Sequence, residues 1–312
     1  MIITVTFNPA IDKTAEVGEL VVGGLNRLSN VRQDAGGKGI NVSKTLKSLG
    51  TKSLAAGFLG GAAGRFIETS LDEQGIDHSF VWVDGTTRTN LKVLNSRMEL
   101  TELNEPGPEV NKKNIDELIE KIMERADENS YVVLSGNVGP GVPDDVYKII
   151  INALKAKQIR VILDADGSLF REGIKAGPYA IKPNRFELGQ YFDIDEDELD
   201  NKKLIELGRR LLNDNTKLVA ISMGTDGSIF ITADEVITAK ALKIDYQSAV
   251  GAGDAMVAAI ADGLAKNMSL TDLVTWAVAV SAGACTTQGT QPAKLETVLE
   301  LRERVEYTPW EE

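Results

Sequence analysis

The chain has 312 residues, of which 43% are hydrophobic and 26% charged, a composition typical of a soluble globular protein. No segment approaches the roughly 18 consecutive apolar residues that a membrane-spanning helix needs. The formal net charge of −12 argues against broad electrostatic binding to nucleic acid or to an anionic membrane. A phosphorylated ligand would therefore have to be held by a local cluster of basic side chains.

Two features bear on where the protein works. Residues 1–5 read directly as a strand with no basic segment before it, so the sequence predicts no signal peptide. The single cysteine, Cys285, excludes an intramolecular disulfide and fits a reducing compartment. We therefore expect a cytoplasmic protein.

Hydrophobic patterning predicts an alternation of strands and helices along most of the chain. The first elements are a strand at 2–7, a helix at 40–49, a strand at 53–59 and a helix at 63–74. A helix at 114–128, a strand at 131–135, a helix at 143–157 and strands at 160–164 and 179–182 follow. The remainder is a helix at 202–213, strands at 218–223 and 228–232, and a mostly helical last third. This order predicts an α/β fold with a mostly parallel sheet covered on both faces.

Two stretches, 12–32 and 86–103, interrupt this alternation. Both show period-two patterning, and glycines at 18, 23 and 24 mark turns in the first of them. The pattern fits either a pair of surface hairpins or the strands of one small sheet, and spacing alone leaves both open.

A glycine-rich turn at 250–254 follows a short extended segment at 243–246 and precedes a helix of small residues. Gly251 and Gly253 allow a sharp turn and a close approach to a ligand. The free N–H groups of the helix would point at that turn and form an anion site. Asp254 is then either a helix cap or a base whose substrate hydroxyl faces a phosphate held at the helix N-terminus.

The sequence lacks the phosphate-binding patterns of two large nucleotide-binding classes. There is no Gly-x-x-x-x-Gly-Lys-Ser/Thr, which excludes a P-loop enzyme. There is also no Gly-x-Gly-x-x-Gly, which counts against a dinucleotide-dependent oxidoreductase.

Three ordered motifs resemble those of the ribokinase-like (PfkB) family of sugar kinases. They are Gly36-Gly37-Lys38-Gly39-Ile40-Asn41-Val42, Lys182-Pro183-Asn184-Arg185-Phe186-Glu187 and Val250-Gly251-Ala252-Gly253-Asp254. The resemblance implies a ribokinase-like three-layer α/β/α fold with a mostly parallel sheet and a small β-sheet lid. The core would comprise 1–11, 33–85 and 104–312, and the lid 12–32 and 86–103. A homodimer formed through the lid is implied as well.

The resemblance also assigns the residues of phosphoryl transfer. Asp254 would be the base, and the backbone N–H groups of Gly251, Ala252 and Gly253 would bind the migrating phosphoryl group. ATP would lie along residues drawn from two segments: Lys182, Asn184, Ser222, Gly224 and Gly227. Asn184 and Glu187 would organise Mg²⁺ through its waters.

On the sugar side the resemblance implies a larger set of contacts. The residues are Asp12, Arg27, Gly36, Gly37, Lys38, Asn41, Arg88, Asn90 and Asn137. Among these, Arg27, Lys38 and Arg88 would grip the phosphate of a phosphosugar, since Arg offers a planar fork and Lys a compact charge. Asn137 departs from the family pattern, which usually has serine there, but its amide can still donate a hydrogen bond.

Segments 23–27, 36–39, 87–92 and 101–108 resemble the 1-phosphofructokinase branch of the family. They imply ATP- and Mg²⁺-dependent phosphorylation of fructose 1-phosphate at its 6-hydroxyl, giving fructose 1,6-bisphosphate. Tagatose-6-phosphate kinases and the minor 6-phosphofructokinase share most of this layout, so both remain alternatives. A non-catalytic sugar-phosphate sensor on the same fold is an alternative of another class.

Overall fold

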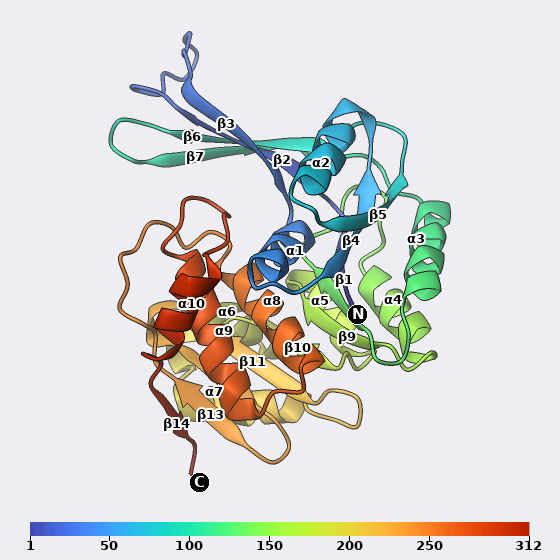
Figure 1. Cartoon of the computed structure of the whole chain (residues 1–312), viewed down its shortest axis with the longest axis vertical. Coiled ribbons are helices and arrows are strands. Elements are labelled where there is room, and N and C mark those ends of the chain that lie inside the picture. The colour runs from blue at the N-terminus through green and yellow to red at the C-terminus, as the bar shows by residue number, and fades with distance from the viewer. Residues whose placement is uncertain (312) are drawn as a thin grey trace.

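The computed structural model describes residues 1–311 and is built around one large sheet. Its strands are β1 (Ile2–Thr6), β4 (Ser53–Leu59), β5 (Asp77–Trp82), β8 (Tyr131–Ser135), β9 (Arg160–Asp164), β10 (Ala180–Ile181), β11 (Leu218–Ser222), β12 (Ser228–Ile231), β13 (Val236–Ala239) and β14 (Tyr307–Pro309). They lie in the order β14-β13-β12-β11-β10-β9-β8-β1-β4-β5 (Figure 1). The strands from β5 to β11 pair in parallel, and β12, β13 and β14 add an antiparallel edge.

Helices cover both faces of this sheet. They are α1 (Lys38–Ser48), α2 (Gly61–Glu73), α3 (Lys112–Arg125), α4 (Val146–Lys155), α5 (Gly167–Ile174), α6 (Arg185–Phe192), α7 (Asn201–Leu211), α8 (Ala252–Ala265), α9 (Leu270–Ala284) and α10 (Leu295–Arg302). The 3₁₀ turns η1 (Glu196–Glu198) and η2 (Gly224–Asp226) complete the list. The predicted α/β fold, with its mostly parallel sheet between two helical layers, is confirmed.

Burial along the strands explains the three layers. In β8, Val132 and Leu134 pack in the core formed with α3, α4 and α7, whereas Tyr131 and Val133 pack in the core formed with α1, α8 and α9. Successive side chains of a strand point to opposite faces, so a strand that is apolar at every position must be covered on both. This is why the buried strands read as continuous apolar runs.

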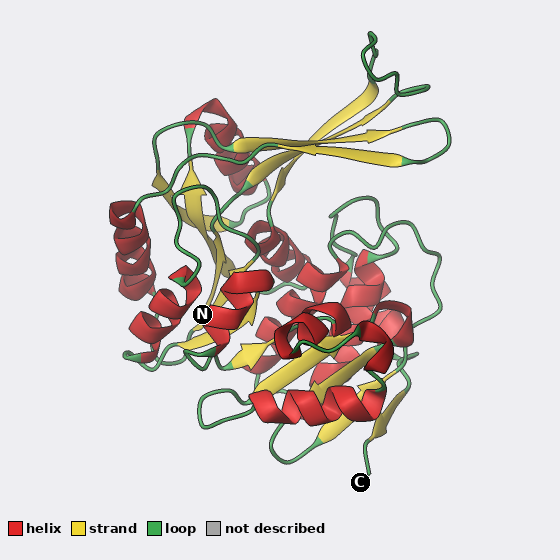
Figure 2. Ribbon diagram, turned by 180° about the vertical axis from the view of Figure 1, so that it is seen from behind, coloured by secondary structure: helices red, strands yellow, loops and turns green. Residues whose placement is uncertain are grey.

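A second sheet of four strands stands off the core, and we call it the lid. It contains β2 (Ala10–Glu16), β3 (Ser29–Gly36), β6 (Arg88–Leu94) and β7 (Leu100–Asn104), in the order β3-β2-β6-β7. β2 pairs with β3 in antiparallel and with β6 in parallel, which brings the two interrupting stretches into one sheet. The lid extends over the side of the molecule where α8 begins (Figures 1 and 2).

Several elements differ from the sequence prediction. The expected extended segment at 243–246 belongs to no strand and lies in the loop between β13 and α8. Within this loop Ile244 packs on the core while its neighbours face solvent. The strand β5 and the short helix α5 were not predicted, since β5 mixes polar and apolar residues and α5 has only two helical turns.

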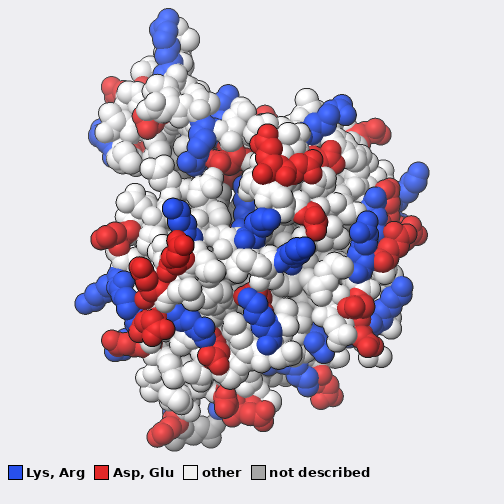
Figure 3. Space-filling view, in the orientation of Figure 1, with Lys and Arg blue, Asp and Glu red and all other residues white. Residues whose placement is uncertain are grey.

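Charged groups are spread over the surface. On the face shown in Figure 3, acidic and basic side chains are interspersed. Within residues 1–311 no helix is long and apolar enough to cross a membrane.

Candidate active site

A cleft of about 1260 Å³ lies between the lid and the core, at the carboxyl ends of the parallel strands. Thr6, Ser135, Asp164 and Ser222 are the last residues of β1, β8, β9 and β11, and all four line this cleft. Open α/β sheets bind ligands at this edge, where loops leave the strands. The topology thus places the glycine turn, the lid and four strand ends around one cavity.

Polar groups without partners mark the same cleft. Across the described chain, eight buried side-chain nitrogen or oxygen atoms have no hydrogen-bond partner. They belong to Thr6, Asn8, Asn41, Asn90, Ser135, Asp164, Arg185 and Ser228, and every one of these residues lines the cleft. Buried polar atoms are rarely left unpaired, because each costs about 1–3 kcal/mol. Their concentration here indicates a binding site for a polar ligand.

The glycine turn has the geometry of an anion site. Gly251 is the N-cap residue of α8 with a φ of 87°, a conformation that L-residues other than glycine seldom adopt. No side chain caps this helix. The N–H of Ala252 donates to the backbone oxygen of Ala249 at 3.2 Å, which leaves the N–H groups of Gly251 and Gly253 to face the cleft that residues 249–254 line. Because a Cβ on Gly253 would lie 3.8 Å from Nζ of Lys182, a cation stands beside these amides.

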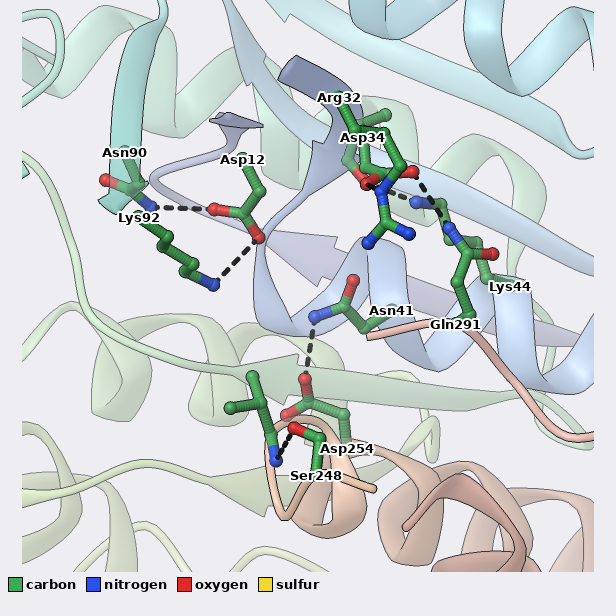
Figure 4. Close-up of polar contacts among 12 residues, drawn as sticks. Asp12, Arg32, Asp34, Asn41, Lys44, Asn90, Lys92, Ser248, Asp254 and Gln291 are labelled. Carbon is green, nitrogen blue, oxygen red and sulfur yellow. Dashed lines mark hydrogen bonds and ion pairs between the residues drawn. The ribbon is translucent and has the colours of Figure 1, made fainter. Parts of the chain in front are cut away.

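Asp254 lies in the first turn of α8 and is 7% exposed. Burial, followed by repulsion from Asp164, raises the pKa of Asp254 to about 6. The side-chain amide of Asn41 donates a hydrogen bond of 2.8 Å to its Oδ2 and opposes this rise (Figure 4). The carboxylate does not cap its own helix. It is thus a buried group that titrates near neutrality and faces a cleft, as a general base should.

A second carboxylate, Asp164, organises the positive charge of the site. Asp164 is 2% exposed, and its oxygens lie 3.2 Å from Nζ of Lys182 and 3.5 Å from Nζ of Lys38. Burial alone would raise the pKa of Asp164, but the two lysines hold it below its ordinary value. Asp164 in turn raises the pKa of Lys38, with a smaller contribution from Asp254. Asp164 therefore holds both lysine side chains near the glycine turn.

Asn184 and Glu187 form a capping box at the start of α6. Oδ1 of Asn184 accepts from the backbone N–H of Glu187 at 2.7 Å, and Oε2 of Glu187 accepts from that of Asn184 at 2.9 Å. Both residues also line the cleft, and burial raises the pKa of Glu187. The pair predicted to organise a metal therefore has a structural role as well, and the cap uses one carboxylate oxygen of Glu187.

The segment predicted to lie along ATP is a tight antiparallel connection between β11 and β12. Ser222, Gly224 and Gly227 line the cleft, and η2 forms the turn. Gly227 has a φ of 102°, and a Cβ there would lie 2.0 Å from the carbonyl oxygen of Ala239. This position therefore admits only glycine.

Asp12 of β2 forms the centre of the lid side of the site. Its Oδ1 accepts a hydrogen bond of 3.1 Å from the amide of Asn90, and its Oδ2 lies 3.5 Å from Nζ of Lys92 (Figure 4). Gly36 does not line the cleft, but a Cβ on it would lie 2.5 Å from Oδ2 of Asp12. A side chain at Gly36 would thus displace this carboxylate. Gly37, with a φ of 115°, lines the cleft at the N-cap of α1.

The predicted basic residues occupy three different places. Arg88 lines the cleft, and its Nε donates to the backbone oxygen of Asn8 at 3.2 Å. Lys38 also lines the cleft, but it lies beside Asp164 at the glycine-turn end. Arg27 is exposed in the loop between β2 and β3 and does not line the cleft of its own chain. Asn137 is exposed and lines the cleft.

Several residues of the cleft were not among the predicted site residues. Thr6, Asn8, Ser135 and Asp164 lie at or just after strand ends, and Lys92 lies on the lid strand β6. A polar residue that follows an apolar strand is the signal that could have indicated the first four. Lys92 carried no such signal, because its cleft-facing orientation depends on strand pairing.

Comparisons with known proteins agree with this geometry. The model of the pfkB family carbohydrate kinases matches residues 5–297. The 1-phosphofructokinase of Borreliella burgdorferi is 37% identical over 287 residues, which cover 92% of this chain and 91% of that protein. The D-tagatose-1-phosphate kinase of Bacillus licheniformis is 35% identical over 258 residues, covering 83% and 84%. A crystal structure of Escherichia coli phosphofructokinase-2 in complex with potassium superposes with a TM-score of 0.92 at 27% identity, covering 97% and 98%.

The charge balance around Asp164 yields a stability prediction. Asp164→Asn keeps the shape of the side chain but leaves the buried ammonium of Lys182 without its counter-charge. We expect a loss of about 3–5 kcal/mol in the free energy of unfolding, measured by urea denaturation. Asp166→Asn is the matched control, because Asp166 is exposed two residues away and should change stability by about 0.5 kcal/mol or less. A loss below about 1 kcal/mol for Asp164→Asn, the scale of an exposed pair, would contradict this account.

Proposed function

This chain belongs to the pfkB family of carbohydrate kinases, which are ATP-dependent enzymes, and we propose that its substrate is fructose 1-phosphate. The product would be fructose 1,6-bisphosphate, formed by transfer of the γ-phosphoryl group of ATP to the 6-hydroxyl. The observation that carries the chemistry is Asp254, a buried carboxylate at a helix N-terminus with two ammonium groups close by. The substrate rests on similarity to the 1-phosphofructokinase of Borreliella burgdorferi.

In the proposed reaction Asp254 is the general base. Its carboxylate accepts the proton of the 6-hydroxyl while that oxygen forms a bond to the γ-phosphorus. The bond from this phosphorus to the bridging oxygen breaks, and ADP leaves. A pKa of about 6 keeps Asp254 mostly ionised at neutral pH, yet basic enough to accept a proton.

We propose that the turn before α8 stabilises the negative charge that develops on the transferred phosphoryl group. The N–H groups of Gly251, Ala252 and Gly253 are fixed dipoles, which stabilise charge without reorganising during the reaction. Lys182 stands beside this turn, and Lys38 is held close by through Asp164. The position of Lys38 therefore favours contact with the transferred phosphoryl group over contact with the far phosphate of the sugar.

Nucleotide and metal would share the other half of the cleft. ATP is proposed to lie along Ser222, Gly224 and Gly227, with its phosphates towards Lys182 and the glycine turn. No group of three or more histidine, cysteine or acidic side chains in residues 1–311 could hold a metal alone. Mg²⁺ usually keeps its waters and uses one or two carboxylates plus substrate phosphates, so Glu187 and Asn184 fit an ion that arrives with ATP. When bound, it would neutralise phosphate charge.

We also propose a homodimer that forms through the lid. The lid exposes several apolar side chains: Val21, Val22, Leu25, Leu28, Val31, Met98, Leu100 and Leu103. Exposed apolar groups gathered on one element are typical of an interaction surface. Arg27 lies in the same region, so its proposed phosphate contact would have to be made across such a dimer. A cytoplasmic location remains a prediction from the single cysteine.

A second substrate is favoured by a specific similarity. The relative from Bacillus licheniformis is a D-tagatose-1-phosphate kinase, and this sugar differs from fructose 1-phosphate at one stereocentre. Tagatose 6-phosphate and fructose 6-phosphate remain the other candidates. All four would use the same base and anion site, so the choice depends on contacts at the lid.

A substrate panel tests the proposed function. ADP release from Mg-ATP is measured with fructose 1-phosphate, tagatose 1-phosphate, fructose 6-phosphate, tagatose 6-phosphate, fructose and ribose. We expect the highest kcat/KM with fructose 1-phosphate. A clear preference for another phosphosugar would overturn the substrate while keeping the kinase chemistry. No turnover with any sugar would instead support a non-catalytic sensor.

The raised pKa of Asp254 predicts the pH dependence of the reaction. Protonated Asp254 cannot accept a proton, so kcat/KM should fall about tenfold per pH unit below about 6. The hydrogen bond from Asn41 lowers this pKa, and its loss in Asn41→Ala should move the acid limb to higher pH. In the control Asn90→Ala, which loses a contact to Asp12 instead, the limb should stay in place. An acid limb of Asn41→Ala that stays in place or moves to lower pH would refute the assignment.

A further inference from the structure

We propose that Lys92 is a further substrate-binding residue, whose ammonium contacts the phosphate group that the phosphosugar already carries. This inference rests on the proposed function and extends it. The phosphate of the substrate lies at the opposite end of the sugar from the hydroxyl that Asp254 serves. Positive charge is therefore needed at the lid end of the cleft.

Strand pairing places Lys92 on the correct side of the lid. Arg88, Asn90 and Lys92 alternate along β6 and so point to the same face of the sheet. All three line the cleft. Figure 4 shows the amide of Asn90 and the ammonium of Lys92 both directed at Asp12. The same face of one strand thus presents two cations with an amide between them.

The side chain of Lys92 leans back along the strand, towards Arg88. Asp12 is paired in register with Asn90, two residues before Lys92, yet its Oδ2 lies 3.5 Å from Nζ of Lys92. The direct cross-strand neighbours of Lys92 are Thr14 on β2 and Glu102 on β7. Among the described residues, Asp12 is nevertheless the one carboxylate within ion-pair distance of this ammonium. The charge is therefore held over the cleft and away from the lid tip.

The contact between Lys92 and Asp12 is long enough for a bound phosphate to replace it. A separation of 3.5 Å exceeds the usual 2.7–3.2 Å of an N–H···O hydrogen bond, and an ammonium has three donors to place. The Lys92 side chain is only 17% exposed, so water satisfies these donors poorly. A phosphate dianion would satisfy them, and it would free one oxygen of Asp12 for a sugar hydroxyl.

Two of the other predicted cations do not reach the lid end of the cleft, where the phosphate of the sugar would bind. Lys38 is engaged by Asp164 at the transfer end, and Arg27 lies outside the cleft of its own chain. Arg88 remains in the cleft. Its Nε donates a hydrogen bond to the backbone oxygen of Asn8, in the turn that follows β1. Lys92 is the second cation on the same strand face. Arg88 and Lys92 of one chain can therefore both contact the phosphate.

The test distinguishes a direct contact between Lys92 and the phosphate from a role in which Lys92 only positions Asp12. Lys92→Gln can still donate a hydrogen bond to Asp12 but carries no charge, whereas Lys92→Arg keeps the charge. We expect KM for fructose 1-phosphate to rise roughly tenfold or more in Lys92→Gln, the scale of a lost charged hydrogen bond, and to recover to within about threefold in Lys92→Arg. KM for ATP should change less than about twofold in both variants, since the ATP sites are distant from β6.

Lys13→Gln is the matched control, because Lys13 follows Asp12 on β2, points to the opposite face and does not line the cleft. The KM of Lys13→Gln for fructose 1-phosphate should stay at the wild-type value. If KM in Lys92→Gln also stays at the wild-type value, the proposal is overturned. A KM raised equally in Lys92→Gln and Lys92→Arg overturns it too, because the side chain would then only position Asp12.

Wild-type kinetics keep the two hypotheses apart. If the wild-type enzyme prefers another phosphosugar, the proposed substrate fails, and the variants are compared on the preferred sugar with the same expectations. If the wild-type enzyme turns over no phosphosugar, both the proposed function and the role of Lys92 fall together.

Discussion

The site depends on the electrostatic balance of two buried carboxylates. Asp254 and Asp164 are both buried and repel each other, which would be costly without positive charge close by. Lys182 and Lys38 supply that charge to Asp164 and hold it ionised. The effects of Lys38 and Lys182 on Asp254 are smaller than those of burial and of Asp164, so the pKa of Asp254 is raised. One carboxylate thus fixes the cations, and the other is free to exchange a proton.

The fold brings these groups together by its topology. Asp164 ends β9, Lys182 follows β10, and Asp254 opens a helix that packs on the same sheet. The parallel arrangement makes all the strand ends meet at one edge. The lid then closes the open side, and Gln291 after α9 donates a hydrogen bond of 2.8 Å to Asp34 of β3 (Figure 4). Since Thr290 packs beside Gly251, the lid and the anion site are joined through one short segment.

Local motifs were predictable from the sequence, whereas partners across strands were not. Gly251 and Asp254 are consecutive parts of one turn, so their geometry follows from local backbone rules. The roles of Asp164 and Lys92 depend on which strands are neighbours and on their register, which spacing alone does not reveal. Arg27 illustrates the same limit, because a basic residue in a matching motif lies at the lid tip, outside the cleft of its own chain. Asn184 and Glu187 show that a pattern read as functional can also form a capping box.

The most direct test of the central claim is the turnover of Asp254→Asn with saturating Mg-ATP and fructose 1-phosphate. The amide keeps the size of the side chain but cannot accept the proton. Provided that ATP binding, measured by equilibrium titration, and the unfolding midpoint stay near wild type, we predict that kcat falls roughly a hundredfold or more. A kcat within a few fold of wild type would show that Asp254 is not the base.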